Sequence, residues 1–254
     1  MRVHVVSDVH GAADALARAG DGADALICLG DLIHFIDYTD YSGIMADLFG
    51  TAAVEQLVGL RTEQRYDDAR LFSRSLWDGV VGDRQAVIDE AVRRQYAVLF
   101  AAFPVPTYLT YGNVDLPHLY PEFARDGLTV LDGETVELGG RIFGFAGGGL
   151  QTPMRTPTEL PDDVYAAKLD ALGTVDVVCT HIPPALPDLT YDVVAHREER
   201  GSVALLALIE RTQPQLALFG HVHQPRSARA VIGRTECHNV GHFRATGTPY
   251  VLEW

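Results

Sequence analysis

The chain has 254 residues, of which 47% are hydrophobic and 21% are charged. This balance is typical of a globular protein and excludes a disordered or fibrous chain. The 34 acidic residues outnumber the 20 basic residues and give a formal net charge of −14. Because a surface of this sign repels nucleic-acid phosphates, we expect no nucleic-acid partner.

The hydropathy of the chain gives an expectation about its location. The sequence has no run of about 18 consecutive apolar residues, so no helix is predicted to span a membrane. The first residues run directly into a strand-like segment and lack the architecture of a signal peptide. We therefore expect a cytoplasmic protein without a membrane partner, whose oligomeric state the sequence does not predict.

Five short apolar runs predict strands that are buried on both faces of a sheet. They lie at residues 3–7, 25–29, 107–111, 175–180 and 216–219. Helix-like stretches at 12–19 and 202–211 separate some of the runs. This alternation predicts a layered α/β domain. Three further strand-like segments, at 226–232, 234–239 and 249–253, predict a second, partly antiparallel sheet near the C-terminus.

The segment at about 37–103 interrupts this alternation of strands and helices. Its last part carries apolar side chains at helical spacing, followed by Pro104: Ile88, Val92, Tyr96, Leu99 and Phe103. A connection of this length needs structure of its own. We therefore expect residues 1–254 to form one domain with a helical, cap-like insertion at about 37–103. The alternative is a buttress that packs away from the site.

Polar side chains follow each of the five apolar runs. In chain order the polar segments are Asp8-Val9-His10, Gly30-Asp31, Gly112-Asn113-Val114-Asp115, His181 and Gly220-His221-Val222-His223. In open α/β sheets, ligands bind at the carboxyl ends of the strands. We therefore expect these five segments to converge on one place.

The donor atoms in this set are those of a metal site. Carboxylate, amide and imidazole donors suit Mn, Fe, Zn, Co or Ni, and the absence of cysteine argues against a structural zinc site. Taken alone, Asp8 or Asp31 would be read as a helix cap or turn former, and His181 as a core histidine. Five such segments, each at the end of an apolar run, indicate metal chemistry instead.

The ordered set resembles the calcineurin-like metallophosphoesterase family, and the resemblance runs from Asp8 to His223. It implies a four-layer α/β/β/α sandwich of two mixed sheets. It also implies two divalent metal ions bridged by Asp31. The ligands implied for the first ion are Asp8, His10, Asp31 and His223, and those that complete the second are Asn113, His181 and His221.

One position departs from the family pattern. Many members have Gly-Asn-His-Asp or Gly-Asn-His-Glu, and that histidine protonates the leaving group, whereas this chain has Val114. The Gly-Asn-Val-Asp pattern is similar to that of a subgroup of small phosphodiesterases. The catalytic acid is therefore unknown, with Asp115, His34 and His118 as candidates, and His242 ranks below them.

These observations together predict an enzyme. We expect a binuclear metal-dependent phosphoesterase that hydrolyses phosphodiesters with a metal-activated hydroxide and acts on a small phosphate ester. One alternative is a phosphomonoesterase that uses another acid, such as His34 or His118. The other is a metal-binding protein-interaction scaffold without significant turnover. The sequence predicts neither the natural substrate nor the native metals.

Overall fold

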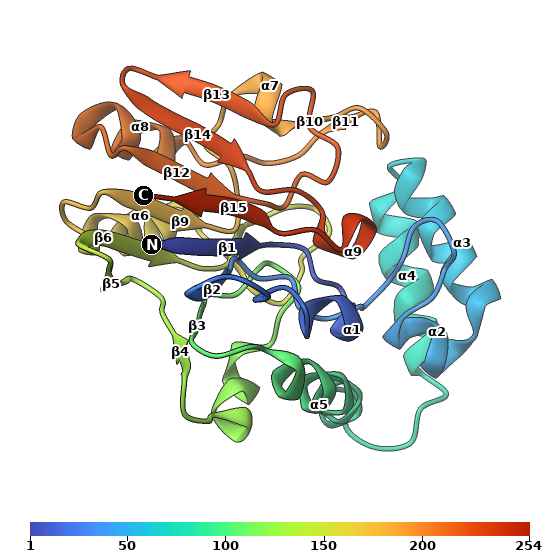
Figure 1. Cartoon of the computed structure of the whole chain (residues 1–254). Helices are drawn as coiled ribbons and strands as arrows, with labels where there is room; N and C mark the ends of the chain where they lie inside the picture. Colours follow the sequence, from blue (N-terminus) through green and yellow to red (C-terminus); the bar gives the residue numbers. More distant parts are fainter.

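Two β-sheets lie face to face at the centre of the computed structural model, which describes residues 1–254 (Figure 1). The first sheet has the strand order β15-β1-β2-β3-β4. Strands β1 to β4 are parallel, and β15 is antiparallel to β1. The bounds are β1 (Arg2–Val6), β2 (Ala25–Cys28), β3 (Thr107–Leu109), β4 (Leu128–Val130) and β15 (Tyr250–Glu253).

The second sheet has the order β13-β14-β12-β9-β6-β5. Its four inner strands are parallel and its two edge strands are antiparallel to their neighbours. The bounds are β5 (Glu134–Leu138), β6 (Arg141–Ala146), β9 (Val177–Thr180), β12 (Leu216–Phe219), β13 (Arg229–Ile232) and β14 (Thr235–Asn239).

The expected second, partly antiparallel sheet is present, but the three C-terminal segments do not all belong to it. Strands β13 and β14 extend the sheet that already contains β12, whereas β15 returns to the first sheet and pairs with β1. In that place β15 covers an edge of the first sheet that would otherwise be unpaired. Its Leu252 side chain is buried in the apolar core between the two sheets.

The alternation of side chains along each strand builds the layers. Val3 and Val5 of β1 point into the core between the sheets, where they join Phe143 and Phe145 of β6. Val6 points the other way, into the apolar cluster on the outer face of the first sheet. Each central strand is therefore buried on both faces, as its uninterrupted apolar sequence predicts.

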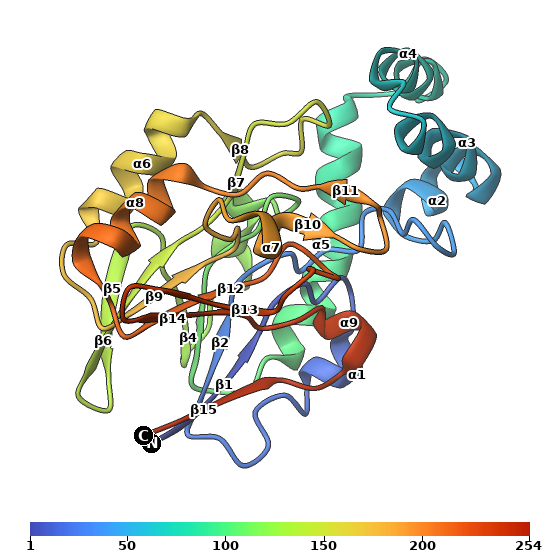
Figure 2. The same cartoon turned by 90° about the horizontal axis from the view of Figure 1, so that it is seen from above.

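Helices cover both outer faces, so the predicted four-layer α/β/β/α sandwich is confirmed (Figure 2). The first sheet is covered by α1 (Ala13–Leu16), α5 (Arg84–Ala102) and the 3₁₀ helix η1 (Pro117–Phe123). The second sheet is covered by α6 (Asp162–Ala171) and α8 (Val203–Thr212). No helix is both long enough and apolar enough to cross a membrane.

The connection between β2 and β3 divides into two parts. Helices α2 (Ile44–Phe49), α3 (Thr51–Thr62) and α4 (Tyr66–Trp77) have an apolar core of their own. By contrast, the apolar stripe of α5 packs into the sandwich, so this helix belongs to a structural layer and not to a cap. Both views place α2 to α4 on the side toward which β1 and β2 run (Figures 1 and 2).

Short elements complete the chain and mostly follow the ends of strands. They are β7 (Gly149–Leu150), β8 (Glu159–Leu160), α7 (Pro187–Thr190), β10 (Tyr191–Asp192), β11 (Arg197–Glu198) and α9 (Phe243–Thr246). Strands β7 and β8 pair with each other, as do β10 and β11.

The two apolar cores predict different responses to the same truncation. Leu57 of α3 and Leu99 of α5 are each 1% exposed. Each Leu→Ala change removes buried methyl groups at a cost of about 2–5 kcal/mol. We expect Leu57→Ala to speed amide hydrogen exchange in α2 to α4 while the strands stay protected, because this core is separate. Leu99→Ala is the matched control and should lower protection from exchange throughout the sandwich. The same pattern of exchange in both variants would contradict the division of the connection into two apolar cores.

Candidate metal centre

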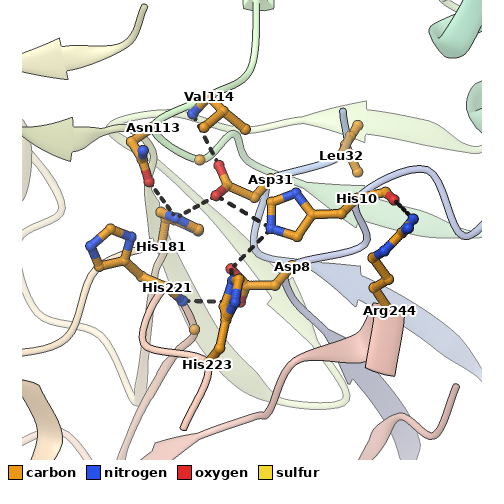
Figure 3. Close-up of polar contacts among 12 residues, drawn as sticks. Asp8, His10, Asp31, Leu32, Asn113, Val114, His181, His221, His223 and Arg244 are labelled. Atoms are coloured by element: carbon orange, nitrogen blue, oxygen red, sulfur yellow. Dashed lines mark hydrogen bonds and ion pairs between the residues drawn. The ribbon is translucent and has the colours of Figure 1, made fainter. Parts of the chain in front are cut away.

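The ends of five central strands meet at one edge of the sandwich. Strands β1, β2 and β3 of the first sheet and β9 and β12 of the second each end in one of the polar segments (Figure 3). Backbone hydrogen bonds join these segments to one another, from Asp8 N to Gly30 O (3.0 Å) and from Gly220 N to His181 O (2.9 Å). The polar side chains are therefore carried by backbone that is tied together within each of the two sheets.

Four of the seven expected ligands have left-handed backbone. The φ angles are 57° at Asp8, 40° at His10, 54° at Asp31 and 69° at His221. This region is uncommon for residues with a Cβ atom and costs of the order of 1–3 kcal/mol at each position. A concentration of such residues in one small volume is characteristic of functional sites, where the position of a side chain outweighs the strain.

Glycines allow the strand ends to approach each other closely. A Cβ atom on Gly112 would lie 2.0 Å from Asp31 Oδ1, and one on Gly220 would lie 2.4 Å from Asp8 Oδ2. Any side chain at these two positions would push the carboxylates out of place. The Gly-Asn and Gly-His pairs in the sequence therefore reflect backbone packed directly against the two aspartates.

One group of donors surrounds Asp8. The Nε2 atom of His10 lies 3.9 Å from Asp8 Oδ1 and also 3.9 Å from Asp31 Oδ2. The Nε2 atom of His223 lies 3.3 Å from Asp8 Oδ1. These four side chains form what we call the first half-site.

A second group of donors surrounds the other side of Asp31. The Nε2 atom of His181 lies 3.4 Å from Asp31 Oδ2 and 3.1 Å from Asn113 Oδ1. The ring of His221 packs edge-on against that of His181, with centroids 5.1 Å apart. Asp31, Asn113, His181 and His221 form the second half-site, and Asp31 lies between the two groups.

The charges of the site call for a cation. Burial alone would raise the pKa of Asp8, but the nearby positive charge of His223, 3.3 Å away, holds it well below its usual range. Burial opposes the charged form of His181 as well, yet the negative charge of Asp31 raises the pKa of that imidazole to about 9. Two buried carboxylates thus stay ionised, and either protons or metal ions must balance them.

The donor atoms themselves fit metal ions. The Nδ1 atoms of His10 and His181 donate to the carbonyl oxygens of Ile33 (2.9 Å) and Leu29 (3.1 Å), so Nε2 is the nitrogen of each ring that would bind a metal ion in place of a proton. His10 Nε2 and Asp8 Oδ1 are buried and have no hydrogen-bond partner. Donor atoms of Asp8, His10 and Asp31 all lie within 4.8 Å of one another. A divalent ion would satisfy these atoms.

Asp115 holds the second and third strand ends together. Its Oδ2 atom accepts hydrogen bonds from the backbone N–H groups of Asp31 (2.8 Å) and Gly112 (2.9 Å), and its Oδ1 atom accepts one from Leu32 (2.9 Å). The Tyr96 hydroxyl of α5 also donates to it. Burial and the charge of Asp31 raise the pKa of Asp115. These contacts occupy its oxygens and give Asp115 the role of a positioning residue.

The two histidines considered as proton donors are engaged elsewhere. His34 Nε2 lies 2.7 Å from the Ser42 hydroxyl and 3.3 Å from Arg244 Nη2. Burial and the charge of Arg244 lower the pKa of His34 to about 4. His118 is exposed and lies 3.3 Å from Asp89 of α5. The structure does not bring His34 or His118 into either half-site.

The end of β14 and the segment that follows it contribute residues that the sequence did not single out or, for His242, ranked low. The Asn239 side chain donates to the carbonyl oxygens of Gly220 and Val222, and Arg244 donates to the carbonyl oxygen of His10 (2.7 Å). Between them, the ring of His242 stacks on His223. The sequence carries only a weak signal for these residues, because polar residues follow the strand-like run at 234–239 but the parallel pairing of β14 with β12 is needed to place them at the same edge.

Asp115→Asn tests this positioning role. The side-chain NH₂ group of the new asparagine would replace an oxygen that now accepts backbone N–H hydrogen bonds, so donors would face donors. We expect this to lower the free energy of unfolding by about 2–5 kcal/mol. The affinity of both half-sites for Mn²⁺ should fall by about 10-fold or more, since the loops that carry Asp31 and Asn113 lose their common anchor. Chemical denaturation and calorimetric Mn²⁺ titration measure the two effects.

Asp176→Asn is the matched control for this change. Asp176 precedes β9, at the other end of that strand, where it accepts a backbone hydrogen bond from Ile142 (2.8 Å). Its replacement should leave Mn²⁺ binding unchanged. Normal Mn²⁺ affinity in Asp115→Asn would show that the carboxylate does not position the ligands.

Comparison with known proteins agrees with this geometry. The model of the calcineurin-like phosphoesterase family matches residues 1–225. One crystal structure has a TM-score of 0.61 and 15% identity, covering 99% of this chain and 98% of that chain. The crystal structure of TT1561 of Thermus thermophilus has a TM-score of 0.55 and 15% identity, with the same coverage. At such identities these two structures show the fold alone.

No curated protein matches the chain. The family model nevertheless spans most of the sequence and includes all five polar strand ends, from Asp8 to His223. The chain therefore belongs to the calcineurin-like phosphoesterase family.

Proposed function

We propose that the chain hydrolyses small phosphodiesters with the help of two divalent metal ions. The observation that carries the proposal is a pair of half-sites that share Asp31, with Asp8 Oδ1 and His10 Nε2 buried and without a hydrogen-bond partner. The proposed ligands are Asp8, His10, Asp31 and His223 for one ion, and Asp31, Asn113, His181 and His221 for the other. Mn, Fe, Zn, Co and Ni all suit such donors.

The residues of the chain supply orientation and charge. Divalent ions in such a site polarise phosphoryl oxygens and make water acidic near neutral pH. The backbone N–H of His221 donates to Asp8 Oδ2 (3.0 Å), and that of Val114 donates to Asp31 Oδ1 (3.1 Å). Each carboxylate therefore has one oxygen fixed by backbone, and the other is free to face an ion.

The proposal of a diester substrate depends on position 114. The Val114 side chain is half-buried and packs against the apolar cluster of the first sheet, so it offers neither a proton nor a hydrogen bond. An enzyme without a donor there is suited to leaving groups that depart without protonation. A phosphomonoesterase and a scaffold without turnover are the competing outcomes of a substrate screen with added Mn²⁺.

We further propose that α2 to α4 border the entrance to the site and limit substrate size. Tyr38, which precedes α2, has its hydroxyl 3.6 Å from the sulfur of Met154 in the loop between β7 and β8. Arg61 of α3 donates to the same hydroxyl (3.0 Å). A side chain of Thr156 from this loop contacts Asn113 (3.0 Å). The helical insertion thus reaches a loop that touches the second half-site.

Removal of single ligands should separate the two half-sites. We expect Asp31→Ala to lose both metal ions and to lower turnover by orders of magnitude, because both half-sites share this carboxylate. His223→Ala should deplete mainly the first ion, and His181→Ala mainly the second. Elemental analysis after dialysis against Mn²⁺, together with kcat for an aryl phosphodiester, measures the effects.

His118→Ala is the control, because this exposed histidine pairs with Asp89 and contacts no ligand. It should keep full metal content and activity. Two ions retained by Asp31→Ala would contradict the shared carboxylate, and two ions with no turnover in the unaltered protein would favour the scaffold.

The absence of a proton donor at position 114 should make the rate of hydrolysis depend strongly on the leaving group. General acid catalysis is worth about 10²- to 10⁴-fold, so alkyl esters should react far more slowly than p-nitrophenyl esters, which need no protonation. We expect Val114→His to raise kcat/KM for alkyl esters selectively. The same rate for aryl and alkyl esters, under conditions where chemistry limits turnover, would show that another acid operates.

A further inference from the structure

His242 lies directly against the first half-site. Its ring stacks on that of His223, with centroids 3.8 Å apart and an interplanar angle of 13°, and its centroid is 5.8 Å from that of His10. Donor atoms of these three imidazoles all lie within 4.8 Å of one another. The Nε2 atom of His242 is buried and has no hydrogen-bond partner.

The backbone holds His242 in this place. The next two N–H groups, of Phe243 and Arg244, donate to the carbonyl oxygens of Ser7 and Asp8, each at 3.0 Å. The Phe243 side chain is 1% exposed and belongs to the apolar cluster of the first sheet. The segment is thus fastened to the same loop that carries Asp8. It also lies beyond the residues that the family model matches.

The stacking geometry argues against His242 as another metal ligand. The lone pair of an imidazole nitrogen lies in the plane of its ring, and a metal–nitrogen bond is about 2.0–2.1 Å long. Two nearly parallel rings direct their lone pairs along nearly parallel planes, which do not converge on one ion. His223 faces Asp8 Oδ1, so His242 is left beside the half-site with a free nitrogen.

We propose that Nε2 of His242 donates a hydrogen bond to a non-bridging oxygen of the substrate phosphate bound over the first half-site. The assignment rests on the proposed function, because it needs a phosphate held by ions at the strand ends. The loop after β3 offers no side-chain donor at Val114, whereas the segment after β14 presents an unused one. His242 would therefore be a substrate-binding residue that acts from the opposite sheet.

Two substitutions distinguish hydrogen bonding from stacking. His242→Phe keeps an aromatic ring against His223 but removes the donor, whereas His242→Gln removes the ring and keeps an N–H group near the position of Nε2. The probe is inorganic phosphate, titrated calorimetrically into Mn²⁺-loaded protein. We expect His242→Phe to weaken phosphate binding by about 10- to 100-fold and His242→Gln to stay within about threefold of the unaltered protein. Both should keep full Mn²⁺ content.

The opposite order of affinities, with Phe tolerated and Gln damaging, would show that His242 only supports His223 and would overturn the assignment. Loss of Mn²⁺ from His242→Phe would overturn it in favour of a metal ligand. If the unaltered protein has esterase activity and neither substitution changes phosphate binding, the proposed role of His242 would be refuted while the proposed function would stand. Absence of both turnover and phosphate binding in the unaltered protein would refute the proposed function itself.

Discussion

The contact on which the site most depends joins one buried carboxylate to backbone from two strand ends. Asp115 accepts hydrogen bonds from the N–H groups of Asp31 and Leu32 after β2, and from Gly112 after β3. Through these bonds the positions of Asp31 and Asn113 are set relative to each other. Because Asp31 faces both groups of histidines, this anchor contributes to the spacing of both half-sites.

This anchor also adds to an electrostatic problem. Three aspartates, Asp8, Asp31 and Asp115, are buried close together, and uncompensated burial of charge is costly. Backbone N–H groups compensate each of them in part. The remaining oxygens of Asp8 and Asp31 face imidazoles, so the fold concentrates a demand for positive charge at one edge of the sandwich. That demand is the physical basis for the proposed metal binding in a protein whose surface is acidic overall.

The sequence predicts the inner strands and the polar residues at their ends well, because strands buried on both faces leave uninterrupted apolar runs. The five runs coincide closely with β1, β2, β3, β9 and β12. The role of α5 was harder to predict, since the stripe from Ile88 to Phe103 has the same spacing whether the helix covers a sheet or caps a site. The partner of β15 could not be predicted either, because it pairs with the other end of the chain.

The roles of two histidines, His34 and His242, could not be predicted from sequence patterns. His34 stands in the loop after Asp31, yet hydrogen bonds to Ser42 and Arg244 engage its ring, and no feature of the sequence encodes them. His242 lacks a motif, and its place beside His223 depends on bonds to Ser7 and Asp8, over 230 positions earlier. Contacts of this kind are decided by tertiary structure alone.

The left-handed backbone at Asp8, His10, Asp31 and His221 has a consequence for the lifetime of the protein. Strain stored at four positions lowers the stability of the empty fold, and ions that bind only the folded state restore stability by mass action. With the proposed ligands, the supply of metal in the surroundings would therefore set how many molecules persist in the folded state as well as how fast each one works. Scarcity of metal would remove the protein through unfolding and proteolysis, in addition to silencing it.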